Sequence, residues 1–329
     1  MRHSILQFNK MEISFLKAYN GDCIHIEHNG HHVIIDGGPK CEELEELLVQ
    51  LVKKDEKVDL LIITHYDEDH ILGIYNILCS LSSSIILKDF VKEVWFNATK
   101  VGYQGNKCWL SSMQAVNFSK LLTEKEIRWV SQIKKDIIFK LDESVFLEVL
   151  YGGEIYQKDS EDRFLSSSSC DWKTSFAELE QYINDDVLDK SATNVQSIIL
   201  VLHDGDKQIL LPGDATPNKL YDTLEVFLKK GNRNVFELIK LPHHGSYHNL
   251  SKKLLEKIVC SHYVITTNGD KYFHPDKKMF LKLIKWGNVK GGESLYFHLN
   301  YFSELFPKLQ ISEKDMLTYK FKCDGKRSF

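Results

Sequence analysis

Residues 58–70 read VDLLIITHYDEDH, and this segment is the most informative one about the fold. Its first part, residues 58–64, is a largely apolar run, which is typical of a strand buried on both faces. Its second part follows that strand directly and places histidines and acids at tight spacing, namely His65, Asp67, Asp69 and His70. A short loop of this kind can supply ligands to two metal ions that lie close together.

The ligand types in this loop indicate the class of metal. Imidazole and carboxylate groups without thiolate suit zinc, manganese or iron. A solvated acidic turn is the simpler alternative, but this turn follows an apolar strand and repeats metal-ligand residue types at close spacing. We therefore interpret residues 65–70 as a metal-binding loop.

Two further apolar runs end in candidate ligands. Residues 208–211 lead through Pro-Gly into Asp214, which is placed at a strand end where it could bridge two cations. Taken alone, Asp214 would also pass for a turn residue or a helix cap. Residues 236–242 (FELIKLP) lead into His243 and His244, and a histidine pair followed by Gly-Ser favours a metal site over a buried structural role.

A third run ends in a candidate supporting residue. Residues 32–38 (HVIIDGG) close with an acid and two glycines, which allow other backbone to approach closely. Asp36 is predicted to orient a ligand histidine through a hydrogen bond. An ordinary turn residue is the alternative at this position.

Composition excludes several classes of protein. The chain has 329 residues, is 43% hydrophobic and carries a net charge of -4, so it can bury a large core and has no overall basic signature for nucleic acid. The seven cysteines show no C-x-x-C spacing, which argues against a zinc ribbon or a disulfide framework. The polar start and the absence of a long apolar run predict a cytoplasmic protein with no membrane insertion.

The order of elements predicts an α/β fold. Two strand-rich halves, each followed by helices, favour a sandwich of two sheets with helices outside. We expect one domain over residues 1–329, with a core at about 11–285, a variable segment at about 100–190 that supplies substrate contacts, and a C-terminal extension at about 286–329. Helices are expected at about 41–54, 71–82, 111–123, 173–186, 217–230 and 250–258.

In this order, the motifs resemble those of the metallo-β-lactamase superfamily: Asp36-Gly37-Gly38, His65–His70, Gly213-Asp214 and His243-His244-Gly245-Ser246. Further motifs carry a narrower resemblance, to the hydrolase domain of ComEC-type DNA-uptake channels and its stand-alone relatives. These motifs are Gly21-Asp22-Cys23-Ile24, Asn194 with Ser197, Leu-Pro-Gly-Asp, His-His-Gly-Ser and His274-Pro275. The resemblance covers about residues 11–285. It implies a four-layer αββα sandwich with an inserted variable segment.

The resemblance also implies a site for two divalent metal ions. One ion would be held by His65, Asp67 and Asp214, with Asn194 added. The other would be held by Asp69, His70, Asp214 and one histidine of the pair, for which we favour His243 and leave His244 open. A water that bridges the ions would attack the substrate, and Asp69 would orient it or accept its proton. The histidine of the pair that is not a ligand, or His274, would protonate the leaving group or bind a phosphate oxygen.

Two departures from the superfamily pattern bear on the metal. Asp67 stands where the superfamily usually has a second histidine, as in the competence-type branch. The chain has no histidine between His70 and His203, and Asn194 is the substitute for the missing third ligand. An amide oxygen is a weak ligand for zinc and a better one for harder ions, so zinc is the first choice and manganese the alternative.

These features predict a phosphodiesterase or nuclease whose substrate is a nucleic acid or a nucleotide. A carboxylic ester or lactone hydrolase of the same fold is the alternative enzyme, and a metal-stiffened scaffold or sensor in a multiprotein complex is the non-enzymatic alternative. A protein partner is implied by the resemblance alone. Lysine pairs such as Lys252-Lys253 and Lys277-Lys278 are interpreted as solvated helix faces. The aromatic residues of the variable segment are interpreted as packing residues, namely Tyr103, Trp109, Trp172 and Phe176.

Overall fold

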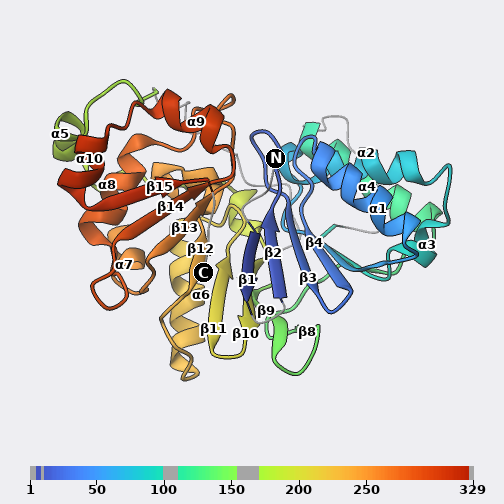
Figure 1. The fold of residues 1–329 in the computed structure, drawn as a ribbon. Helices are drawn as coiled ribbons and strands as arrows, with labels where there is room; N and C mark the ends of the chain where they lie inside the picture. The colour runs from blue at the N-terminus through green and yellow to red at the C-terminus, as the bar shows by residue number, and fades with distance from the viewer. Residues whose placement is uncertain (1–4, 9–10, 99–109, 154–169, 326–329) are drawn as a thin grey trace.

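The computed structural model describes residues 5–8, 11–98, 110–153 and 170–325. In these residues the strands form two sheets, one of seven strands and one of eight. The sheets lie face to face, and helices cover the outer side of each (Figure 1). The predicted αββα sandwich is therefore confirmed.

The first sheet has the strand order β1-β2-β3-β4-β5-β6-β7. Strands β1 to β4 pair antiparallel, and β4 to β7 pair parallel. All six residues of β5 are buried, as the apolar run predicted. The strands are β1 (Ile5–Phe8), β2 (Met11–Phe15), β3 (Ile24–His28), β4 (His31–Ile35), β5 (Val58–Ile63), β6 (Val94–Phe96) and β7 (Trp129–Val130).

The second sheet has the order β15-β14-β13-β12-β11-β10-β9-β8. Strands β8 to β11 pair antiparallel, and β11 to β15 pair parallel. The strands are β8 (Ile138–Lys140), β9 (Val145–Tyr151), β10 (Ile199–Asp204), β11 (Lys207–Leu211), β12 (Leu238–Lys240), β13 (His262–Ile265), β14 (Leu295–Leu299) and β15 (Phe321–Asp324).

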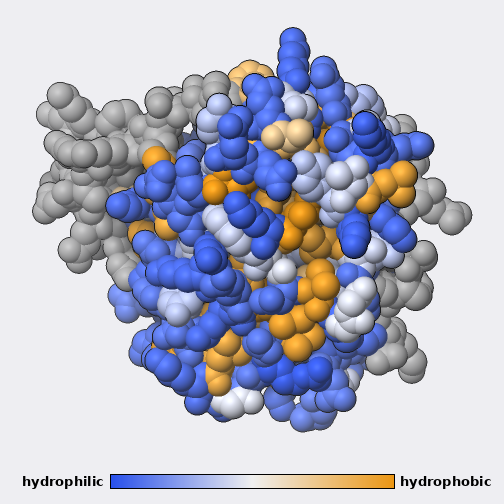
Figure 2. Space-filling model, turned by 90° about the vertical axis from the view of Figure 1, so that its left-hand side faces the viewer, coloured by the Kyte–Doolittle hydropathy of each residue, from blue (hydrophilic) through white to orange (hydrophobic). Residues whose placement is uncertain are grey.

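Helices pack on both outer faces, as Figure 1 shows. Over the first sheet lie α1 (Glu42–Lys53), α2 (Glu68–Leu81), α3 (Leu87–Phe90) and α4 (Leu110–Glu124). Over the second lie α5 (Phe176–Leu179), α6 (Pro217–Lys229), α7 (Lys252–Leu255), α8 (Lys277–Trp286), α9 (Phe302–Leu309) and α10 (Glu313–Tyr319). Figure 2 shows the side that carries α5, α7, α8 and α10 as mostly hydrophilic, with small apolar patches.

Alternating side chains of the central strands divide the core into layers. In β5, Leu60 and Ile62 face the layer between the two sheets, whereas Leu61 and Ile63 pack against the helices over the first sheet. Amphipathic α1 illustrates the outer packing, because its buried residues Leu44, Leu48 and Leu51 recur at helical spacing.

Several predictions of local structure differ from the structure. The helix expected at 173–186 is wrong: only α5 and the short 3-10 helix η1 (Glu180–Tyr182) form there. The chain then turns at Asn184, whose side chain accepts a hydrogen bond from the backbone of Asp186, and this Asx-type contact competes with a helix. The helix expected at 250–258 is shorter, because α7 ends at Leu255.

The segment at 100–190 contributes more than surface loops. Its strand β7 joins the first sheet and its strands β8 and β9 join the second. Beyond residue 285, strands β14 and β15 extend the second sheet. Trp172 and Phe176 are buried in the core over that sheet, as predicted, while Tyr103 and Trp109 lie outside the described residues. The predicted domain boundaries stay a prediction.

One lysine prediction is wrong for a specific reason. Lys277 is 2% exposed, and its ammonium donates hydrogen bonds to three carbonyl oxygens, those of Trp172, Thr174 and Gln310. Lys252 and Lys253 are exposed, as predicted.

Among the helices that the structure describes, none combines the length and the apolar composition needed to cross a bilayer.

Candidate metal centre

The candidate ligands meet because strands from both sheets end at the same edge. Asp36 follows β4, His65 follows β5, Asp214 follows β11, and the pair His243 and His244 follows β12. The carboxyl ends of parallel strands lie along one edge of a sheet, which is where α/β proteins usually bind ligands. Since the sheets are stacked, the two edges bring these loops together.

Acids and histidines form overlapping groups whose ligand atoms lie within 4.8 Å of one another. Asp214 and His70 each belong to more than one group. The Oδ2 atom of Asp214 lies 3.3 Å from His70 Nε2 and 3.6 Å from His244 Nε2. The same His244 nitrogen lies 3.7 Å from Asp69 Oδ2. The groups are His65/His70/Asp214, Asp69/His70/His244, Asp22/Asp214/His244 and Asp22/Asp36/His70.

Several buried polar atoms of this cluster lack a hydrogen-bond partner, and they show whether the cluster fits a metal ion. Among the described residues, the Nε2 atoms of His65, His70 and His244 are buried without a hydrogen-bond partner. The Oδ1 atom of Asp214 is in the same state. Buried polar atoms without partners are costly in a folded protein and require an explanation. Three imidazole nitrogens that converge on carboxylates are explained by divalent cations, so the residues fit the predicted group.

The opposite nitrogens of two histidines are held by hydrogen bonds. His70 Nδ1 donates to Asp36 Oδ2 over 2.8 Å, and His244 Nδ1 donates to the carbonyl oxygen of Thr266 over 3.0 Å. Asp36 in turn accepts hydrogen bonds from the backbone nitrogen and the hydroxyl of Thr64, over 2.8 and 2.7 Å. A proton on Nδ1 leaves Nε2 free as a ligand atom, and such contacts commonly fix metal-binding histidines.

Two predicted ligands lie near the cluster but less centrally. Asp67 Oδ2 is 3.5 Å from His65 Nε2, and its side chain is 29% exposed. Asn194 is buried, and its amide nitrogen donates to Asp189 Oδ2 over 2.7 Å. That bond orients the Asn194 side chain, since its amide nitrogen is engaged with the acid. Ligand roles for both residues stay predictions.

The two histidines of the pair differ in burial and in their distance from the carboxylates. His244 is 2% exposed and lies among the carboxylates, whereas the His243 side chain is 27% exposed and its Nε2 lies 3.9 Å from Asp214 Oδ2. Both residues have left-handed backbone, with φ of 48° and 54°. His244 Nε2 therefore lies nearer the Asp214 carboxylate, and the ligand role within the pair stays a prediction. His243 lies next to His274, with 5.2 Å between ring centroids.

Two residues of the cluster were not predicted as part of the site. Asp22 lies 3.2 Å from His244 Nδ1 through its Oδ1 and forms an ion pair with Lys240. Lys240 is 1% exposed, lies 3.5 Å from Asp214 Oδ1 and donates to the carbonyl oxygen of Gly213 over 3.2 Å. A lysine inside the apolar run FELIKLP was the available signal, because a buried lysine requires a charged partner.

Charges in the cluster shift the pKa values of its members. Burial alone would raise the pKa of Asp214, but His244, His70, His243 and Lys240 hold it well below its usual value. Burial alone would lower the pKa of His244, but Asp214 and Asp22 raise it to about 9. Asp214 therefore stays ionised, and the negative charges of Asp214 and Asp22 favour positive charge at His244.

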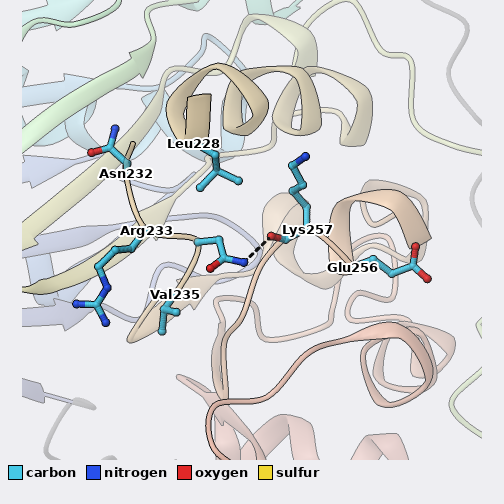
Figure 3. A pocket seen from close by; sticks show the side chains of 7 residues that line it. Leu228, Asn232, Arg233, Val235, Glu256 and Lys257 are labelled. Carbon is cyan, nitrogen blue, oxygen red and sulfur yellow. Dashed lines mark hydrogen bonds between the residues drawn. The ribbon is translucent and has the colours of Figure 1, made fainter. Parts of the chain in front are cut away.

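A cavity of about 520 Å³ lies elsewhere and carries no comparable cluster. Its lining includes Leu228, Arg233, Val235 and Lys257 (Figure 3). The Asn234 side chain donates a hydrogen bond of 3.2 Å to the Lys257 carbonyl oxygen. Leu228 lies at the end of α6 that is remote from Asp214, roughly 16 Å along the helix axis. The cavity is therefore separate from the metal cluster.

Comparisons with known proteins agree with the motif reading. Residues 16–103 match the family model described as the metallo-beta-lactamase superfamily. This range includes Asp36 and the His65–His70 loop, whereas Asp214 and His244 lie outside it. No curated protein matches the chain.

Similar solved structures are distant in sequence. The metallo-beta-lactamase fold protein YhfI of Bacillus subtilis is 9% identical with a TM-score of 0.43, and the match covers 95% of this chain and 95% of that one. A proposed metal-dependent hydrolase of Parabacteroides distasonis is 10% identical with a TM-score of 0.42, covering 88% of this chain and 97% of that one. A metallo-beta-lactamase of Pontibacter korlensis is 12% identical with a TM-score of 0.34, covering 70% and 86%.

Proposed function

We propose that the chain is a hydrolase that cleaves phosphodiesters with two divalent cations, zinc being the first choice and manganese the alternative. The observation that carries this proposal is the convergence of three buried, unpartnered imidazole nitrogens on the shared carboxylate of Asp214 in the described residues. A shared carboxylate between two ligand groups is the arrangement that a two-metal site needs.

The ligands divide into two sets around Asp214. One cation would be held by His65, Asp67 and Asp214, with the amide oxygen of Asn194 as a further ligand. The other would be held by Asp69, His70, His244 and Asp214. Such cations supply Lewis-acid chemistry, since they lower the pKa of water and neutralise charge on phosphate oxygens.

The chain's own residues then have separate tasks. Asp36 fixes the ring of His70, and the Thr266 carbonyl fixes that of His244. Asp69, whose Oδ2 accepts a hydrogen bond from Asn20 over 3.3 Å, is positioned to accept the proton of the attacking water. His243 and His274 lie at the edge of the cluster, where one of them binds a phosphate oxygen or protonates the leaving group.

The choice of phosphodiesters rests on two supports. Two adjacent cations suit in-line displacement at phosphorus, because they stabilise the attacking and leaving oxygens together. The second support is the likeness of the Asp22 and His274-Pro275 motifs to those of the competence-type hydrolase domain. That likeness also supports a nucleic acid or nucleotide as the substrate and a protein as a partner.

The test is hydrolysis of bis-p-nitrophenyl phosphate and of single- and double-stranded DNA with zinc, manganese or magnesium. Metal-dependent turnover is expected for the wild type, with a loss of at least about 100-fold in Asp69→Ala if this acid handles the proton. Asp206→Ala is the matched control, because Asp206 is an exposed acid in the β10–β11 turn. A protein that binds two metals but hydrolyses no phosphodiester contradicts the proposal and favours a carboxylic ester or lactone substrate, or a scaffold.

A further inference from the structure

Next to the metal cluster, the loop between β13 and α8 exposes two consecutive aromatic residues. Tyr272 is 49% exposed and Phe273 is 45% exposed, and Lys271 precedes them. We call these three residues the aromatic rim. Large aromatic side chains are usually buried for their apolar surface, so an adjacent exposed pair is a candidate contact surface.

The backbone holds the aromatic rim in an unfavourable conformation. Tyr272 and Phe273 both have left-handed backbone, with φ of 63° and 57°. Such conformations are costly for bulky residues, cluster at ligand sites and persist only where surrounding structure fixes them. Phe273 packs edge-on against Trp172, 5.9 Å between ring centroids, and the Trp172 indole donates to the Pro275 carbonyl oxygen over 2.8 Å. The Phe273 ring is therefore held in place by packing against Trp172.

Contacts on both sides connect the aromatic rim to the metal cluster. On one side, the ring of Tyr272 lies 6.5 Å from that of His274, which itself lies 5.2 Å from that of His243. On the other side, Lys271 Nζ lies 3.9 Å from Glu68 Oε2, and Glu68 directly precedes Asp69. A molecule with a phosphate on the cluster would extend over the rim.

The rim combines stacking surfaces with a cation. Lys271 Nζ lies 5.0 Å from the centroid of the Tyr272 ring, and its side chain is 45% exposed. Proteins that bind single-stranded nucleic acid combine aromatic rings, on which bases stack, with positive charges that follow the backbone. A simple alkyl phosphodiester would leave the exposed parts of both rings in contact with solvent.

We propose that the aromatic rim binds the base of a nucleotide-type phosphodiester whose phosphate occupies the metal cluster. Tyr272 and Phe273 supply the stacking surface, and Lys271 contacts a flanking phosphate or the sugar oxygens. This inference rests on the proposed function, because it assigns to the aromatic rim the binding of the substrate's base at the same site. It makes Tyr272 a residue for substrate selection that takes no part in proton transfer.

A binding experiment tests the rim without turnover. Adenosine 5′-monophosphate and ribose 5-phosphate share the sugar and the phosphate, and only the first has a base. Calorimetric titration of the metal-loaded protein should show about tenfold tighter binding of the nucleotide, which is within the range for one stacked base. Tyr272→Ala should remove this preference and leave ribose 5-phosphate binding unchanged, while Tyr272→Trp should retain it. Leu317→Ala, at a 79% exposed side chain on α10, is the control.

A kinetic experiment separates the rim from the proposed function. Thymidine 5′-(p-nitrophenyl phosphate) and methyl p-nitrophenyl phosphate have the same leaving group, and only the first carries a base. Tyr272→Ala should raise the KM for the nucleotide ester about tenfold and leave both kcat and the hydrolysis of the methyl ester unchanged. If both esters are hydrolysed without a preference for the base, the base-binding role of the aromatic rim is wrong and the proposed function is still supported. If neither ester is hydrolysed, the proposed function fails, and the calorimetric preference still decides the rim.

Discussion

Replacement of Lys240 by methionine tests how the cluster is held together. Lys240 is almost completely buried and is bound to Asp22 and Asp214. Methionine keeps a similar apolar length and removes the charge, so the main effect is the loss of one cation between two buried carboxylates. The metal-free protein should therefore be strongly destabilised.

The magnitude follows from the distance between the charges. At 3.5 Å, the separation of Lys240 Nζ and Asp214 Oδ1, an effective dielectric constant of about 20 gives an attraction of about 5 kcal/mol. Breaking a buried ion pair by removal of one partner typically costs about 3–5 kcal/mol. We expect a loss in this range for the metal-free protein, measured as the free energy of unfolding in urea.

Added metal should partly reverse this loss. Without the competing ammonium group, the carboxylates should attract divalent cations more strongly, and a ligand that binds only the folded state raises its stability. Zinc or manganese should therefore raise the free energy of unfolding more in Lys240→Met than in the wild type.

A second buried lysine supplies the control for this experiment. Lys282 is fully buried, but it donates to the carbonyl oxygens of Tyr247 and Leu250, away from the carboxylates of the cluster. Lys282→Met should also destabilise the protein, but with the same gain from metal as in the wild type. The reasoning is refuted if Lys240→Met loses less than about 1 kcal/mol without metal, or if metal stabilises both variants equally.

Two further predictions concern residues behind and away from the metal cluster. Asp36→Asn should weaken metal binding about 10- to 100-fold, because Asp36 fixes the ring of His70. Competition with a chromogenic chelator measures the metal affinity. An unchanged affinity would exclude a positioning role for Asp36. His25 is expected to make stability depend on pH, because burial and His32 lower its pKa from 6.5 to about 3. The folded state prefers the neutral ring of His25. Its contribution to the free energy of unfolding is therefore fully present above about pH 6.5 and is lost as the pH falls towards 3. Between pH 7 and 4, the free energy of unfolding in urea should fall by up to about 3 kcal/mol less for His25→Gln than for the wild type. Identical pH profiles for the two proteins would contradict the assignment.

The sequence was informative where a local pattern has one structural solution. The apolar run at 58–64 predicted a strand buried on both faces, and β5 is buried throughout. The spacing of Leu44, Leu48 and Leu51 predicted a helix, and α1 buries these residues. The ends of the apolar runs were predicted to carry the candidate ligands, and these loops gather in the structure because parallel strands bring the residues that follow them to one edge.

The sequence was less informative where orientation depends on tertiary contacts. His243 and His244 are neighbours in sequence but differ in burial, and both have left-handed backbone, which no pattern of residue types predicts. Lys277 lies in a run that resembles a solvated helix face, but carbonyl groups from distant segments surround its ammonium. Asp22 joins the cluster through contacts with Lys240 and Thr266, more than 200 residues away in sequence.

Metal content is the most direct test of the central claim. Elemental analysis of protein equilibrated with zinc or manganese and then freed of unbound metal should give two ions per chain for the wild type. Asp214→Ala should retain at most one, since Asp214 belongs to both ligand sets, and Asp206→Ala should retain two. A wild-type protein that holds no more than one ion, or an Asp214→Ala variant that still holds two, would contradict a two-metal site built around Asp214.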